Sequence, residues 1–377
     1  MKKRRSPRGV LATLLLIVAH FLLFPYPLGR EVVLRARWRV PLPAEGTAVE
    51  GVASVGAAAA SAPFQLGDLY GFVTPDGELA SLARTPFRVA LSRRGAVAYA
   101  RIGGTWVLDG PSGRALASFS GDGYPLLSPE GDRILLVKTD LTGLRELDEY
   151  GEVAWTRDFP SLLTSVAIAG DWLAAGHLDG SVSVVDRRGA VLFEDAPAGS
   201  RIAATFGVAV TADGGRLAAV TGIEPQLLTL WRRSRGGYAV SARVPLGTDS
   251  RREVRIAFAA DERSVACEGD GAAAIVDTAS GERSLVSLRG RMTGLAFVGP
   301  ATGRPGAWLA AARDGEDAEI AVVRPPGAVL ARVPLARRSA GAARGAWGPD
   351  SPWVGTTGDT LLVAFAGSLV GLGLEAR

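Results

Sequence analysis

The sequence predicts an all-β fold made of repeated four-stranded antiparallel units, preceded by one N-terminal transmembrane helix. A layout of four short β-prone runs recurs about every forty residues, glycine-rich turns separate the runs, and helix-period apolar spacing is absent. The 48 Gly and 22 Pro among 377 residues suit many tight turns better than long helices. Repeats of this length with four strands each are typical of the blades of a β-propeller.

The N-terminus predicts a membrane anchor. Met1–Arg8 carries five positive charges, and the uncharged stretch 10–29, apolar from Val10 to Phe24 apart from Thr13 and His20, is long enough to span a bilayer. No small-residue cleavage site follows it, which favours an uncleaved signal anchor over a secreted protein released by signal cleavage. The positive-inside tendency then places tail 1–9 in the cytoplasm. We expect a single-pass protein of the bacterial inner membrane with its propeller in the periplasm.

Residues 30–47 have two interpretations. The string Arg-Val-Pro-Leu occurs at 39–42, 243–246 and 332–335, and the last two copies end a predicted fourth strand. The first copy therefore indicates an outer strand that pairs with the last blade. The alternative is a linker from the membrane, with Trp38 near the bilayer surface.

Residues 48–377 are predicted to form the propeller. The segment Val89–Phe119 shows the unit, with four β-prone runs separated by three turns. First-strand elements with a central alanine are Val166–Ile168, Val208–Val210, Ile256–Phe258, Leu295–Phe297 and Gly345–Trp347. The third turn recurs at Pro75–Gly77, Asp109–Gly113, Asp148–Gly151, Asp186–Gly189, Arg235–Gly237, Asp277–Gly281, Arg324–Gly327 and Ala366–Gly367. Eight occurrences indicate eight blades, with seven as the alternative count.

Two of these stretches carry a family resemblance. Asp148–Trp155 and Asp277–Arg283 resemble the blade-closing turn of quinoprotein-type (PQQ-like) propellers, and Gly176–Asp186 is similar to the same stretch of WD-repeat propellers. In form the chain resembles the propeller component of the outer-membrane barrel-assembly machinery. That component is lipid-anchored, whereas no Cys follows the apolar run here.

Few residues suit catalysis. The PQQ-like resemblance implies a dehydrogenase that holds its cofactor with a vicinal cysteine pair, but Cys267 is the single cysteine. His177 is the one histidine outside the predicted anchor, and it adjoins a predicted turn. We therefore expect no cofactor, no metal site and no enzymatic activity.

The charge distribution argues against nucleic-acid binding. Residues 1–39 hold nine basic side chains and one acidic one, so the rest has 42 − 9 = 33 basic against 38 − 1 = 37 acidic residues. Nucleic-acid binders concentrate positive charge on the binding domain, and here the excess lies in the tail.

One pattern of side chains remains as a candidate site. The second turn of six successive predicted blades carries an acid, and these turns open on one face of a propeller. The acids are Asp140, Asp179, Glu224, Asp270, Asp314 and Asp359. Such a ring would attract cationic partner segments, although Asp-Gly is also good turn chemistry. We expect a non-enzymatic scaffold for envelope or membrane proteins; the alternative is an enzyme or small-ligand sensor that uses the central channel.

Overall fold

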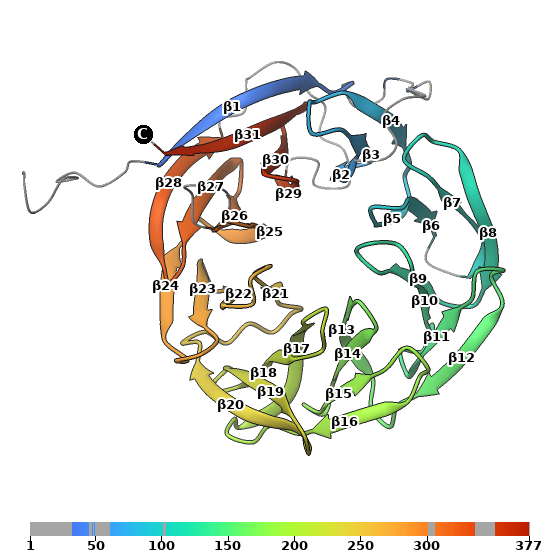
Figure 1. Ribbon diagram of the computed structural model, residues 1–377, viewed down its shortest axis with the longest axis vertical. Coiled ribbons are helices and arrows are strands. Elements are labelled where there is room, and N and C mark those ends of the chain that lie inside the picture. The colour runs from blue at the N-terminus through green and yellow to red at the C-terminus, as the bar shows by residue number, and fades with distance from the viewer. Residues whose placement is uncertain are drawn as a thin grey trace, which may run out of the picture.

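The computed structural model shows a closed ring of eight β-sheets around a central axis (Figure 1). The structure describes residues 32–44, 47, 49, 61–100, 103–300, 306–335 and 351–376. The predicted all-β propeller of eight blades is confirmed. The predicted tail 1–9 and signal anchor 10–29 lie outside the described residues, and no helix in the described ranges is long and apolar enough to cross a membrane.

The described residues form 31 strands, numbered in chain order. They are β1 (Val32–Pro41), β2 (Ala62–Leu66), β3 (Leu69–Val73), β4 (Leu79–Arg84), β5 (Arg88–Leu91), β6 (Ala96–Tyr99), β7 (Gly104–Asp109), β8 (Ala115–Gly121), β9 (Tyr124–Leu127), β10 (Ile134–Val137), β11 (Gly143–Leu147), β12 (Val153–Asp158), β13 (Leu163–Ala169), β14 (Trp172–His177), β15 (Val182–Val185), β16 (Val191–Asp195), β17 (Ile202–Val210), β18 (Arg216–Ile223), β19 (Leu227–Ser234), β20 (Gly237–Pro245), β21 (Ile256–Phe258), β22 (Ser264–Gly269), β23 (Ala272–Asp277), β24 (Arg283–Ser287), β25 (Arg291–Val298), β26 (Ala307–Asp314), β27 (Asp317–Arg324), β28 (Ala328–Leu335), β29 (Trp353–Thr357), β30 (Thr360–Phe365) and β31 (Ser368–Ala376).

Consecutive strands pair antiparallel within each blade. Blade 1 has three described strands, β2–β4, and blades 2 to 7 take four strands each, from β5–β8 to β25–β28. The first strand of each four-stranded blade lies nearest the axis and the fourth lies on the rim (Figure 1). The predicted first-strand elements at Val166, Val208, Ile256 and Leu295 fall in the inner strands β13, β17, β21 and β25. The fifth, Gly345–Trp347, lies outside the described residues.

The two ends of the described chain close the ring in blade 8. Strand β1 pairs antiparallel with β31, from Val32 opposite Ala376 to Pro41 opposite Ser368, and the sheet order is β1-β31-β30-β29. Of the two interpretations of residues 30–47, the structure supports the outer strand: Val32–Pro41 is the fourth strand of blade 8. The prediction that Ala366–Gly367 is a third turn is wrong, because the N-terminal strand supplies the fourth strand and this turn joins the second and third.

Because neighbouring strands in a blade run in opposite directions, successive turns lie alternately on two faces of the ring. We define the second-turn face by the turns between the second and third strands of the blades and by the connections that lead to the next blade; these turns include Thr139–Thr142, Leu178–Ser181 and Asp270–Gly271. The first-turn face carries the turns between first and second and between third and fourth strands. Strand β1 begins at the first-turn face, because Val32 pairs with the last residue of the third strand of blade 8.

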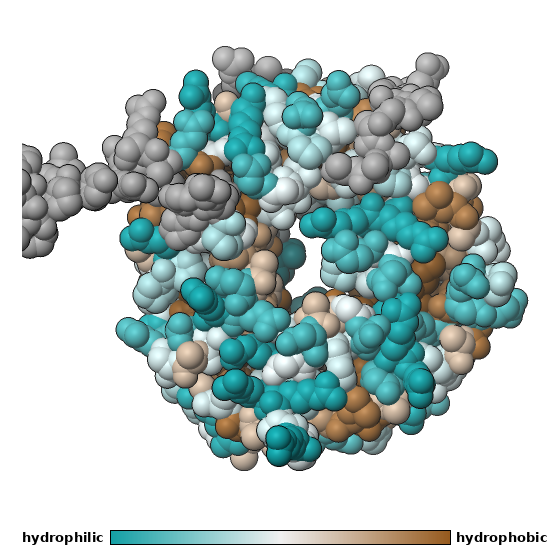
Figure 2. Space-filling model, viewed as in Figure 1, coloured by the Kyte–Doolittle hydropathy of each residue, from teal (hydrophilic) through white to brown (hydrophobic). Residues whose placement is uncertain are grey.

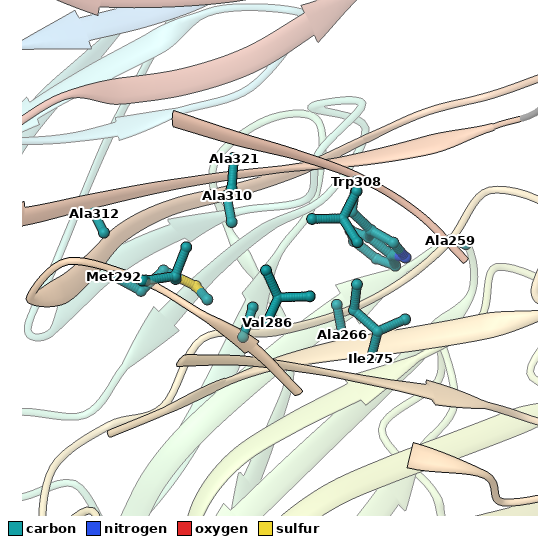
Figure 3. Packing of buried hydrophobic residues seen from close by; sticks show 12 residues of the cluster. Ala259, Ala266, Ile275, Val286, Met292, Trp308, Ala310, Ala312 and Ala321 are labelled. Atoms are coloured by element: carbon teal, nitrogen blue, oxygen red, sulfur yellow. The ribbon is translucent and has the colours of Figure 1, made fainter. Parts of the chain in front are cut away.

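Adjacent blades are held together by buried apolar side chains. In the cluster between blades 6 and 7, Met292 and Trp308 pack with Ile275 and Val286 (Figure 3). The indole of Trp308 is 1% exposed, and its Nε1 donates a hydrogen bond of 3.0 Å to Ser264 Oγ. A large aromatic side chain therefore fills the space between these two blades.

Trp38 belongs to the same kind of interface. Its Nε1 donates to the Pro75 carbonyl at 2.7 Å, and its ring lies over Gly77 in the third turn of blade 1. Trp155 of blade 3 makes the equivalent contacts with Arg187 and Gly189 of blade 4. The position of Trp38 relative to a bilayer stays a prediction; in the structure its ring packs between blades 8 and 1.

Candidate interaction face

Five of the six predicted acidic residues lie together on the second-turn face. Each follows or ends the second strand of its blade, in blades 3 to 7 respectively, and each is exposed. These residues are Asp140, Asp179, Glu224, Asp270 and Asp314. The blade repeat therefore does place acids from five successive blades on one side of the ring.

Asp359 does not belong to this group, and the prediction of a six-membered ring is wrong at this position. It lies between β29 and β30, the first and second strands of blade 8, so it faces the first-turn side. Its carboxylate accepts two hydrogen bonds of 2.7 Å from the guanidinium of Arg37 in β1. This hydrogen bonding raises the pKa of Arg37. The pair ties the closing strand to blade 8.

The sequence reasoning missed an acid in blade 1. Asp68 lies in the turn between β2 and β3, and its carbonyl accepts the N–H of Thr85, which follows the outer strand β4. The same closing hydrogen bond joins Phe159 to Thr142 in blade 3 and Leu288 to Gly271 in blade 6, so Asp68 lies on the second-turn face. The Gly67-Asp68 dipeptide was the available signal. Arg84 neutralises Asp68 through contacts of 2.6 and 2.5 Å.

Two of the acids also hold their own turns in place. Asp140 Oδ1 accepts hydrogen bonds from the backbone N–H and the hydroxyl of Thr142, at 2.9 and 2.7 Å. Asp179 Oδ1 accepts the same pair from Ser181, at 3.0 and 2.7 Å. The hydroxyl and backbone donors lower the pKa of Asp140; at Asp179 desolvation opposes this, but the Ser181 donors prevail and the pKa is lowered. Both carboxylates are thus anionic well below neutral pH.

The other three acids differ in their pairing. Glu224 accepts a hydrogen bond of 2.6 Å from Arg201, which lowers the Glu224 pKa and cancels its charge locally. Asp270 and Asp314 are exposed and make no side-chain hydrogen bond or ion pair within the described part of the chain. The negative charge available to a partner is therefore concentrated on Asp140, Asp179, Asp270 and Asp314.

The second-turn face also exposes apolar side chains that sequence reasoning did not single out. Leu141 (38% exposed), Leu162 (39%), Leu178 (51%) and Ile202 (42%) belong to the turns and connections of blades 3 to 5. We call these four residues the apolar patch. A signal for it was the leucine of the Asp140-Leu141-Thr142 turn, where such turns usually carry glycine.

His177 and Cys267 are buried and have structural surroundings. His177 is 1% exposed, its Nε2 lies 3.0 Å from Ser183 Oγ, and its ring packs against Phe159 with centroids 4.8 Å apart. Desolvation lowers its pKa. Burial raises the pKa of the Cys267 thiol to about 12. Among the described residues, no three His, Cys, Asp or Glu side chains are grouped as a metal would require.

Two further spaces could hold a small ligand. Figure 2 shows an opening at the centre of the ring, surrounded by a mixture of hydrophilic and hydrophobic residues. A cavity of about 370 Å³ lies between blades 2 and 3 on the first-turn side, lined among others by Arg94, Asp132, Glu146 and Arg187. Glu146 is committed to a buried ion pair with Arg133, with N–O distances of 2.9 and 2.7 Å.

The geometry defines a closed eight-bladed β-propeller whose two faces differ in their turns. The chain belongs to the β-propeller protein family, whose model matches residues 1–340. An uncharacterised protein of Treponema pallidum (strain Nichols) is 24% identical over 233 residues, covering 62% of this chain and 61% of the relative. The chain thus matches about three fifths of that relative's length.

Solved structures show the same fold at low sequence identity. BamB from Moraxella catarrhalis superposes with a TM-score of 0.58 at 14% identity, covering 90% of this chain and 100% of that one. Kuenenia stuttgartiensis hydrazine synthase superposes with a TM-score of 0.52 at 12% identity, covering 78% of this chain and 95% of that one. These likenesses support the propeller architecture.

Proposed function

We propose that this protein is a membrane-tethered, extracytoplasmic scaffold that binds other envelope proteins through its second-turn face and catalyses no reaction. One observation carries the proposal: five successive blades present exposed acids on the face opposite to the one where β1 begins. Repeated exposed groups on one face give a broad surface for protein recognition, and like charges there speed encounter with cationic partners.

The predicted anchor is compatible with this orientation. If residues 10–29 span the inner membrane, only residues 30 and 31 separate the span from β1. The first-turn face would then lie toward the bilayer and the second-turn face would point into the periplasm. The likeness of the fold to BamB is compatible with a protein-interaction role.

In-cell photo-crosslinking of the tagged full-length protein tests the proposal. A photoreactive residue replaces Asp270 on the second-turn face or, as the matched control, the exposed Glu149 on the first-turn face. We expect a small, reproducible set of envelope proteins from position 270 and few from position 149. Equal or empty capture at both positions, with the protein confirmed in the membrane fraction, would overturn the scaffold.

Charge substitution gives a second readout on any captured partner. Changing Asp179, Asp270 and Asp314 to Asn removes three charges and keeps the side-chain oxygen with which residue 179 caps its turn. We expect weaker association and a flatter salt dependence with an unchanged melting temperature. Unchanged binding at low and high salt would mean that these acids are present because they suit the turns and that they do not recruit a partner.

A second candidate function is a small-ligand sensor or enzyme that uses the central channel. The opening in Figure 2 and the occurrence of this fold in hydrazine synthase favour it. A cofactor absorbance spectrum of the purified protein, or a melting temperature raised by a small molecule, would support this reading over the scaffold.

A further inference from the structure

We infer that the apolar patch on the second-turn face is a docking site for a partner segment that combines aliphatic or aromatic side chains with flanking Lys or Arg residues. This inference rests on the proposed scaffold function and names the chemistry of its partner. Four observations support it: the patch residues adjoin one another, their backbone groups are already hydrogen-bonded, Leu141 has a disfavoured backbone conformation, and the border of the patch is negatively charged.

The backbone positions that carry the patch adjoin one another across three blades. The backbone N–H of Leu163 donates to the Leu141 carbonyl at 2.7 Å, and that of Leu178 donates to the Leu162 carbonyl at 2.8 Å. These bonds bring Leu141, Leu162 and Leu178 side by side. Across the next blade boundary, a Cβ built on Gly180 would lie 3.0 Å from Ala203 Cβ, which puts Ile202 next to the same turn.

Its surroundings are rigid. Phe159, which begins the connection that carries Leu162, is buried against the His177 ring, and its N–H donates to the Thr142 carbonyl at 2.8 Å. The N–H of Asp179 donates to Ser161 Oγ at 3.2 Å. A surface whose backbone groups are already paired loses little conformational entropy when a partner binds.

Leu141 occupies a position that costs backbone energy. Its φ is 59°, in the left-handed region that favours glycine, and the equivalent residues of blades 4, 6 and 7 are Gly180, Gly271 and Gly315, with φ of 88°, 59° and 59°. A non-glycine residue is disfavoured there. Leu141 is 38% exposed and belongs to none of the buried apolar clusters, so core packing does not explain a leucine here, which is the pattern expected when strain is retained for binding.

The remaining exposed large hydrophobic residues show that this clustering is not general. Except for Phe87, also on the second-turn face, they lie on third or outer strands or, for Tyr150, in a third turn. Leu285 on β24 is an example, and at 50% exposure it matches Leu178. Scattered rim residues of this kind are ordinary, whereas adjacent ones mark interaction sites.

The border of the patch is negatively charged. Asp122, Asp140, Asp158 and Asp179 adjoin its turns, and Lys138 is the base that pairs with two of them, at 2.9 Å from Asp158 and 3.9 Å from Asp140. Four carboxylates against one ammonium leave net negative charge; the nearby Arg201 is already paired with Glu224. An apolar centre with an acidic border is complementary to an amphipathic basic protein segment, whereas anionic lipid headgroups would be repelled.

Fluorescence anisotropy with three synthetic peptides of one length tests this on the full-length protein in detergent. The first peptide alternates Leu and Arg, the second replaces Leu by Ser, and the third replaces Arg by Glu. We expect only the first to bind. The variant L162S/L178S should weaken binding of the first peptide by about tenfold or more, because each leucine that the bound peptide covers contributes to the binding free energy. The variant L285S should leave this binding unchanged.

The variant Leu141→Gly tests whether binding can be weakened without any loss of stability. Glycine relieves the left-handed backbone, so we expect a melting temperature equal to or above that of the wild type together with weaker peptide binding. D140N/D179N should flatten the salt dependence of binding without unfolding the turns. Equal binding of the three peptides, or wild-type affinity in L162S/L178S, would overturn the site.

Four outcomes distinguish other causes. Retention on anionic vesicles that is lost in L162S/L178S would replace the protein segment by a lipid surface, and a dimer lost in the same variant would replace it by a second copy; both overturn the inference. If the peptides fail while position 270 still crosslinks a defined set of proteins, the scaffold stands and this site is wrong. If both fail, the scaffold falls with it.

Discussion

The indole Nε1 of Trp38 donates a hydrogen bond of 2.7 Å to the carbonyl of Pro75, and this contact joins the closing strand of blade 8 to blade 1. Gly77 lies beneath the ring with φ of 90°, and a Cβ on it would lie 2.6 Å from the indole. Because β1 is held by pairing with β31 and by this interface, Trp38 stabilises the closed ring.

We expect Trp38→Ala to lower the free energy of unfolding by about 3 kcal/mol, because it leaves a large void at the closing interface. Trp38→Phe keeps most of the packing and should cost about 1 kcal/mol through the lost hydrogen bond. Urea denaturation measures both. Equal stability of Trp38→Ala and wild type would show that pairing of β1 with β31 closes the ring by itself.

The buried ion pair of blade 3 should be sensitive to removal of one partner. Arg133 is 1% exposed and makes a bidentate contact with Glu146, while its third nitrogen lies 3.3 Å from the Gly170 carbonyl of blade 4. Glu146→Gln should destabilise by about 3 kcal/mol, because the guanidinium stays buried without a counter-charge. Replacing both residues by Met should recover much of this loss.

Thermal unfolding at one pH compares the three proteins. Glu224→Gln is the control, since its partner Arg201 is on the surface and we expect no measurable change. A Glu146→Gln variant as stable as the wild type would mean that Arg133 finds other acceptors.

His177 should make the stability depend on pH. Desolvation lowers its folded pKa, so the unfolded chain binds a proton that the folded chain does not. The stabilising contribution is complete above the unfolded pKa of about 6.5 and is lost as the pH falls toward the folded pKa. Between pH 7.5 and 5.5 we therefore expect the free energy of unfolding to fall. His177→Gln should remove this fall; a variant that keeps the wild-type dependence would place its origin elsewhere.

Cys267 should be inert in the folded protein. Its side chain is fully buried in β22, and burial raises the pKa of the thiol to about 12, so almost no thiolate is present at pH 8. A chromogenic disulfide reagent should therefore release no thiolate from the native protein and one equivalent after unfolding in urea. Rapid reaction without denaturant would show that blade 6 opens locally.

The candidate site was predictable where it depended on turn chemistry. Asp140, Asp179 and Asp270 each sit beside a turn residue in the left-handed region, and the repeat spacing places those turns on one face. Asp359 also lies beside a residue in the left-handed region, Gly358, yet it lies on the other face. Local sequence could not show this, because the face of a turn depends on how many strands precede it in its blade.

The apolar patch was not predictable for a related reason. Leu141 and Leu178 lie in the second turns of two different blades, and Leu162 lies in the connection between these blades. Only the hydrogen bonds between successive blades bring the three residues together. Leucines are common in strands and turns of this chain, so apart from Leu141, which stands where such turns usually carry glycine, their individual positions carried no signal.

The sequence by itself determined the all-β class, the four-stranded repeat and the number of blades, because these depend on residue periodicity and turn composition within about forty residues. The tertiary structure alone decided that Val32–Pro41 is the outer strand of blade 8, which acids share a face, and that Trp38 packs between blades. The closing strand depends on pairing between segments more than three hundred residues apart, such as Arg37 and Asp359 at a separation of 322, and this pairing also places Trp38 against blade 1. No local pattern encodes such a pairing, since it is selected only when the whole ring closes and buries the surfaces on both sides.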